Sequence, residues 1–140
     1  MVWACFWELE QSNLYALERN FESKKNSYSA RFYIHVLDDN LPRIYQLDLI
    51  FMQDNAPIHT AKAMALWFHE NSINVMEWPP YSPDMNPIEY LWFLLKEHVY
   101  KVSPHINDVP GDEDKIKKIL FDALYKAWET LDKYYLHNLV

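Results

Sequence analysis

The sequence predicts an α/β fold, because strand-like apolar runs and segments of helical periodicity alternate along its 140 residues. The clearest strand-like run covers residues 49–53 and ends at Asp54. Apolar residues recur at helical spacing in residues 61–71, in residues 87–101 and again from about residue 112. With 50% hydrophobic residues, a chain of this length can bury one core and is one domain by size.

Charge and cysteine content narrow the class of function. Thirteen basic and twenty acidic residues give a net charge of −7, the opposite of the basic surface expected of a protein that neutralises many phosphates. Binding to nucleic acid therefore has to be local or mediated by metal ions. Cys5 has no second cysteine to pair with, so we expect a buried, reduced thiol in an intracellular protein. The sequence contains neither a membrane-spanning apolar run nor a signal-peptide pattern.

The first part of the chain predicts a hairpin followed by a helix. Residues 2–7 and 13–17 are short aromatic and β-branched runs, and the five residues between them include no glycine to favour a positive φ. Residues 29–40 have helical spacing, and we expect the acidic pair near residue 38 and Pro42 to end that helix. The positions expected to face its core are Phe32, Ile34 or His35, and Leu37.

Two acidic residues stand where strand and helix ends can converge. Asp54 follows the strand-like run, and Glu89 falls in the first turn of the helix predicted for residues 87–101. Clustered carboxylate oxygens are the ligands that Mg²⁺ and Mn²⁺ prefer. A structural alternative exists for each residue. Asp54 also fits a simple turn after a strand, and Glu89 fits a capping box with Asn86.

Three other features leave alternatives open. His59 can support a metal site, contact DNA, or be a structural histidine near a helix cap. Trp92 lies on the apolar stripe of its helix, which favours a core role over base stacking. The stripe consists of Ile88, Leu91, Trp92, Leu95 and Val99, and the final helix has apolar residues at 116, 119, 120, 123, 124, 127, 128 and 131. Its basic cluster, Lys115, Lys117 and Lys118, fits a solvated helix surface better than a phosphate contact.

Two segments carry a resemblance to a known family. Residues 51–60 read FMQDNAPIHT and residues 78–92 read WPPYSPDMNPIEYLW, and they resemble the second and third acidic motifs of the Tc/mariner transposases. Thirty-four residues, 55 to 88, separate Asp54 from Glu89, a spacing characteristic of one branch of that family. The resemblance implies a ribonuclease-H-like domain, a mixed sheet flanked by helices. Three acidic residues in it bind two metal ions, Mg²⁺ or Mn²⁺, and Asp54 and Glu89 would be two of these catalytic metal ligands.

The resemblance also implies a boundary. It is strong over residues 49–101, weaker before residue 46 and negligible after residue 102. In the family the first acidic residue sits on a central strand upstream of the hairpin, and this chain begins too late to contain it. We therefore expect residues 1–101 to form a partial ribonuclease-H-like catalytic domain that lacks its first central strand. Residues 102–140 are expected to form a linker and a C-terminal amphipathic helix that packs on it.

The expected function follows from the family. Transposases of the DDE superfamily cut DNA at transposon ends and join it to a target, and we expect this part of such an enzyme to be inactive alone. The alternative is a non-catalytic, transposase-derived module for nucleic-acid binding or protein interaction. The resemblance implies DNA as partner and a nuclear or other intracellular location without membrane attachment, and it leaves a homo-oligomer open.

Overall fold

The structure is a computed structural model that describes residues 1–17, 28–46, 48–80, 82–108 and 110–139. It separates into two compact units, which we treat one at a time. The Asp54 unit comprises Met1–Trp3 and Leu17–Asn86, and the Glu89 unit comprises Ala4–Ala16 and Pro87–Val140. Short strands and helices occur together along the chain, which confirms the α/β class.

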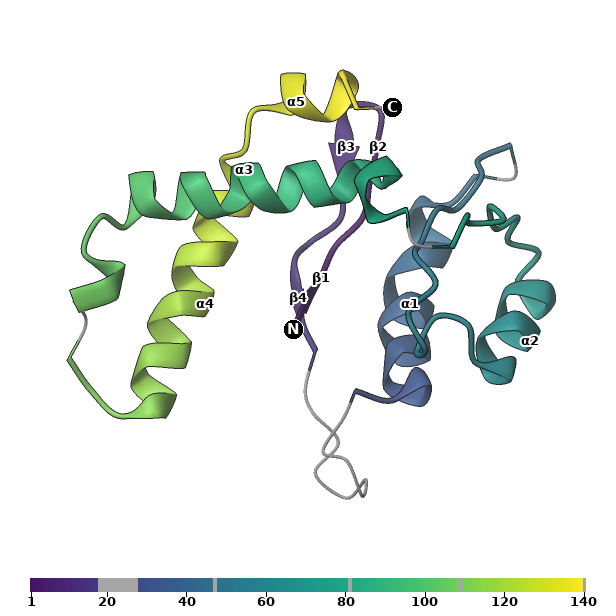
Figure 1. The fold of residues 1–140 in the computed structure, drawn as a ribbon, viewed down its shortest axis with the longest axis horizontal. Coiled ribbons are helices and arrows are strands. Elements are labelled where there is room, and N and C mark those ends of the chain that lie inside the picture. Colours follow the sequence, from purple (N-terminus) through teal and green to yellow (C-terminus); the bar gives the residue numbers. More distant parts are fainter. Residues whose placement is uncertain (18–27, 47, 81, 109, 140) are drawn as a thin grey trace. The chain divides into compact units, whose positions relative to one another are not determined.

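Two helices form the core of the Asp54 unit. They are α1 (Ala30–Ile44) and α2 (Lys62–Glu70), which contact each other and are accompanied by β1 (Val2–Trp3) and a 3-10 turn, η1 (Pro83–Met85) (Figure 1). The apolar face of α2 is the one expected, because Met64, Trp67 and Phe68 are all buried. Trp67 also donates its indole N–H to Asp38 Oδ1 at 3.2 Å, which links the two helices.

Helix α1 differs from its prediction at both its inner face and its end. It starts as expected after Ser29, whose side chain accepts the N–H of Phe32 at 3.2 Å. It does not stop before Pro42: the proline lies inside the helix, in its last turn, where it has no N–H to donate to the carbonyl four residues earlier. The Asn40 amide donates to the Val36 carbonyl at 2.7 Å within the helix. The buried positions are Tyr33, Val36, Leu37, Asn40 and Leu41, which confirms Leu37. The other predicted core positions were wrong, because Phe32 and Ile34 are only half-buried and His35 is exposed.

The predicted strand before Asp54 is reduced to one bridge. Phe51 pairs in parallel with Val75, donating its N–H to Asn74 O at 2.7 Å and accepting that of Met76 at 2.9 Å. Ile50 is 55% exposed, so this apolar run is not the buried strand that its composition favours. The Tyr45 hydroxyl ties the same two segments together, since it donates to Leu49 O and accepts from Asn74 N–H, both at 2.8 Å.

A hairpin is present in the Glu89 unit as predicted, but its second strand lies within residues 8–12, which were expected to form the turn. Strands β2 (Phe6–Trp7) and β3 (Glu10–Gln11) pair antiparallel, and β4 (Tyr15–Ala16) follows. The register of β2 and β3 leaves a loop of two residues, Glu8 and Leu9. Glu8 adopts the positive φ of 47° that such loops require, a conformation that glycine usually supplies.

Two long helices pack against each other in the Glu89 unit (Figure 1). They are α3 (Pro87–Val102) and α4 (Glu113–Glu129), separated by a 3-10 turn, η2 (Ile106–Asp108), and α4 is followed by α5 (Lys133–His137). Trp128 is the centre of this core, 1% exposed, with its indole N–H donated to Ser12 O at 2.7 Å. Its ring lies 5.7 Å from that of Trp92, which is half-buried and packs at the edge of this core.

The predicted final helix is two helices. Asp112 caps α4 as expected by accepting the Lys115 N–H at 2.9 Å, but α4 ends at Glu129. Asp132 then caps α5 by accepting the Tyr134 N–H at 2.9 Å. Leu131, predicted on the helical stripe, lies in the connection between the two helices and is buried there.

Cys5 is a free thiol. Desolvation by burial raises its pKa to about 12, and the hydrogen bond with Ser12 lowers the pKa by a smaller amount. The thiol is therefore neutral at physiological pH.

Within the described parts of the chain, every helix is too short or too polar to cross a bilayer.

Candidate metal and catalytic site

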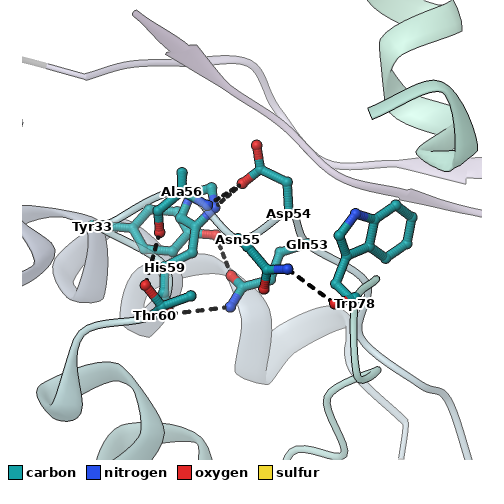
Figure 2. Close-up of polar contacts among 8 residues, drawn as sticks. All are labelled: Tyr33, Gln53, Asp54, Asn55, Ala56, His59, Thr60 and Trp78. Carbon is teal, nitrogen blue, oxygen red and sulfur yellow. Dashed lines mark hydrogen bonds and ion pairs between the residues drawn. The ribbon is translucent and has the colours of Figure 1, made fainter. Parts of the chain in front are cut away.

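Asp54 lies directly after the bridged segment, with one of its carboxylate oxygens fixed. Oδ1 accepts the backbone N–H of Ala56 at 3.0 Å, which makes a local Asx turn, and it lies 2.5 Å from Nδ1 of His59. Figure 2 shows the other oxygen pointing away from both donors. The Asp54 side chain is 45% exposed, so this second oxygen is available to a ligand.

His59 is held on the far side of its ring as well. The ring packs on that of Tyr33 with centroids 4.6 Å apart, and the histidine side chain is 18% exposed. The Tyr33 hydroxyl donates to Gln53 Oε1 at 3.1 Å, and the Gln53 amide donates to the His59 carbonyl at 3.4 Å (Figure 2). Helix α1 thus supports the turn that carries Asp54.

A second side chain of the same turn reaches the segment that leads toward Glu89. The Asn55 amide donates to the Trp78 carbonyl at 2.9 Å (Figure 2). Trp78 begins a proline-rich stretch, whose prolines restrict the backbone. Asn55 therefore does more than end a strand, since it joins the two motifs of the resemblance within the Asp54 unit.

A cleft of about 480 Å³ opens beside Asp54. Polar groups, among them Asp54 and His59, line part of its wall, and apolar side chains of α2 and of residues 73–78 line the rest. The lining residues include Gln53, Asn55, Phe68, Ile73, Val75 and Trp78. Asp54 thus borders a space that a ligand can enter.

Glu89 occupies the position predicted for it, in the first turn of α3. Its side chain is exposed, and a carboxylate there is favoured by the partial positive charge of the helix N-terminus. Asp54 and Glu89 belong to different units, and each is described within its own unit. Their roles as a pair of metal ligands therefore remain a prediction, as does the capping alternative for Glu89.

The donor set can be compared with the metal that the resemblance implies. Across the described residues, no three His, Cys, Asp or Glu side chains are grouped so that they could hold a metal ion. The Asp54 unit offers one hard carboxylate oxygen that lacks a hydrogen-bond partner among these residues, and the Glu89 unit offers an exposed carboxylate. The chemistry of these oxygens fits Mg²⁺ or Mn²⁺, and a complete set of ligands requires more than either unit alone supplies.

The sequence left the role of His59 open and did not identify Gln53 or Tyr33 as part of the site. A signal was present for Gln53, because it is the one polar residue among residues 49–53 and directly precedes Asp54. Tyr33 carries no such signal, since its contact with His59 joins residues far apart in the sequence.

Comparison with known proteins assigns the family. Residues 15–129 match the DDE superfamily endonuclease model. The Tcb2 transposase of Caenorhabditis briggsae is 31% identical over 136 residues, which are 94% of this chain and 43% of that protein. The Tc3 transposase of Caenorhabditis elegans is 33% identical over 144 residues, covering 100% of this chain and 39% of that protein. The chain thus spans less than half the length of these curated relatives.

Solved structures support the same fold. The catalytic domain of the Mos1 mariner transposase superposes with a TM-score of 0.57 at 19% identity, covering 99% of this chain and 72% of that domain. Its structure with raltegravir and magnesium gives 0.57 at 24% identity, covering 81% and 56%. At these identities the likeness shows the ribonuclease-H-like fold. Together with the family match, it places this chain in the DDE superfamily of endonucleases, among the transposases of the Tc/mariner type.

Proposed function

We propose that this chain is part of a transposase catalytic domain in which Asp54 and Glu89 hold divalent metal ions for the cleavage and transfer of DNA strands. The observation that carries the proposal is the state of the Asp54 carboxylate. Its Oδ1 is fixed by Ala56 and His59, its other oxygen has no such partner among the described residues, and Asp54 is one of the residues that line a cleft. The Asx turn with Ala56 also fits a residue that only ends a strand, so the contact with His59 and the exposure of the Asp54 side chain are what favour a ligand role.

The two carboxylates act as ligands and not as proton-transfer groups in this proposal. A bound Mg²⁺ or Mn²⁺ would activate a water molecule or a 3′ hydroxyl of the DNA and would stabilise the leaving oxygen. Asp54 contributes a pre-oriented oxygen, because the two hydrogen bonds from Ala56 and His59 fix Oδ1 and leave the second carboxylate oxygen for the metal. Glu89 contributes a carboxylate from a helix end whose backbone is fixed by the buried residues of α3.

The family site has a third acidic residue, for which we propose no residue of these 140. The domain organisation that we propose follows from this missing third residue. Residues 1–101 act as part of a ribonuclease-H-like catalytic domain without its first central strand, and residues 102–140 act as a linker and helical segment. The partners are transposon-end and target DNA, reached in the nucleus.

DNA binding tests the proposal, because a chain with a net charge of −7 has to bind a polyanion either locally or through metal ions. We expect affinity for a fluorescent duplex to be at least about tenfold higher with Mn²⁺ than with EDTA, a difference of roughly 1.4 kcal/mol. Asp54→Asn and Glu89→Gln should abolish the Mn²⁺ effect. Asp48→Asn and Glu97→Gln, which change exposed carboxylates in the same two units, should retain it.

Equal binding in Mn²⁺ and EDTA would contradict the proposal and support the non-catalytic module. Plasmid nicking measured in the same mixtures provides a second result. Nicking that needs Mn²⁺, Asp54 and Glu89 would support the metal roles and overturn the expectation that the chain is inactive alone.

A further inference from the structure

The geometry points to His59 as a positioning residue of this site. We infer that His59 donates its Nδ1–H to Asp54 Oδ1 and thereby fixes the carboxylate so that its other oxygen is presented to a cation in the cleft. The inference rests on the proposed function, because it needs Asp54 to be a metal ligand. It assigns His59 no direct contact with the metal or with DNA.

The direction of the hydrogen bond follows from the chemistry of its partners. An ionised carboxylate only accepts hydrogen bonds, so a nitrogen 2.5 Å from Asp54 Oδ1 has to be the donor. The hydrogen of a neutral His59 ring is therefore on Nδ1, and Nε2 has none. Ala56 donates its N–H to the same oxygen, so Oδ1 is fixed from two directions.

The ring is held in the orientation that this hydrogen bond needs. Its face packs on Tyr33, which is 2% exposed and therefore cannot move aside without disturbing the core of the unit. The backbone of His59 is held too, because its N–H donates to Ala56 O at 2.8 Å and its carbonyl accepts from Gln53. Rotation of the His59 ring would break both its hydrogen bond to Asp54 and its packing on Tyr33.

This arrangement has a consequence for metal affinity. A carboxylate free to rotate loses rotational freedom when it binds a cation, and a carboxylate that is already oriented avoids most of that cost. Partners that orient a metal ligand typically change metal affinity by 10- to 100-fold when they are removed. His59 is the described side chain that contacts the carboxylate of Asp54, so its removal should have an effect of that size.

The test is Mn²⁺ binding by the full chain, followed by electron paramagnetic resonance of the free ion. Asparagine ends where Nδ1 stood and keeps a donor there, whereas glutamine places its amide near Nε2 and leucine has no donor. We expect His59→Leu and His59→Gln to raise the Mn²⁺ dissociation constant about tenfold or more. His59→Asn should stay within about threefold of the wild type, and His35→Leu, which removes an exposed histidine of α1, should change nothing.

Each other result has a defined meaning. If His59→Gln kept the Mn²⁺ affinity of the wild type and His59→Asn lost it, the inference would be overturned and Nε2 would be a direct metal ligand. Equal affinity in all His59 variants would overturn the inference and leave the proposed function standing. Wild-type binding that is unaffected by Asp54→Asn would overturn the proposed function and this inference with it.

A second readout needs no metal. Nitrogen-15 NMR of the imidazole, at about pH 9 where a histidine ring is ordinarily neutral, reports which nitrogen carries the hydrogen. We expect the Nδ1–H tautomer of His59 in the wild type and its loss in Asp54→Leu. The Nε2–H tautomer in the wild type would overturn the inference.

Discussion

The two acidic residues of the proposed site are supported in different ways. Asp54 follows a single bridge and depends on side chains from other parts of its unit, His59 foremost. Glu89 lies in the first turn of a 16-residue helix whose inner face is buried through Leu91, Leu95 and Val99. The position of Asp54 is therefore set by tertiary hydrogen bonds, and that of Glu89 by local helical structure and apolar packing.

The difference has an energetic scale. A net hydrogen bond contributes about 1 kcal/mol, whereas full burial of a leucine or valine contributes roughly 1.5–3 kcal/mol. Loss of one contact near Asp54 should therefore displace its carboxylate at a modest cost in stability. Substitutions in the α3–α4 core should instead destabilise the whole Glu89 unit.

The largest effect is expected for Trp128→Ala in the Glu89 unit. The substitution removes a side chain that is 1% exposed, its hydrogen bond to Ser12 O, and its contact with Trp92. Large-to-small changes of buried aromatic residues cost about 3–5 kcal/mol, which we expect in the free energy of unfolding measured by urea denaturation. Tyr125→Ala, at a 39% exposed position of the same helix, should cost under about 1 kcal/mol. Equal costs for the two variants would mean that packing on α4 does not support α3.

A smaller effect is expected for Tyr45→Phe in the Asp54 unit. The hydroxyl joins Leu49 and Asn74 on either side of the single bridge, so its removal breaks two hydrogen bonds. We expect a loss of about 1–2 kcal/mol in the free energy of unfolding. Tyr100→Phe is the control, because that residue is 50% exposed and its hydroxyl bonds to no described residue. A change as small as that of the control would show that the bridge itself holds these segments.

The sequence predicted the helices of both units better than the extended segments. Helices carry their signals locally, as Ser29 and Asp112 show by capping α1 and α4 at the expected positions. The break after Glu129 was also signalled, because Asp132 is a typical N-cap, but the continuing apolar spacing concealed it. The extended run before Asp54 could not be judged locally, because the exposure of Ile50 depends on which segments flank it.

The candidate site shows the same division. The motifs identified Asp54 and Glu89 as residues, and the first turn of α3 was predictable from Pro87. The contacts that orient Asp54 were not predictable, since they require the turn to bring His59 back and α1 to place Tyr33 behind it. The conformation of Glu8 in the other unit was not predictable either, because a glutamate gives no sequence signal for a φ of 47°.

The most direct test of the account is whether Mn²⁺ binding depends on both Asp54 and Glu89. Calorimetric titration of Mn²⁺ into the wild type, Asp54→Asn and Glu89→Gln measures this, with Asp48→Asn and Glu97→Gln as controls. We predict that Asp54→Asn and Glu89→Gln each weaken binding by at least about tenfold and that the two controls bind like the wild type. An Asp54→Asn or Glu89→Gln chain that binds Mn²⁺ like the wild type would contradict the account.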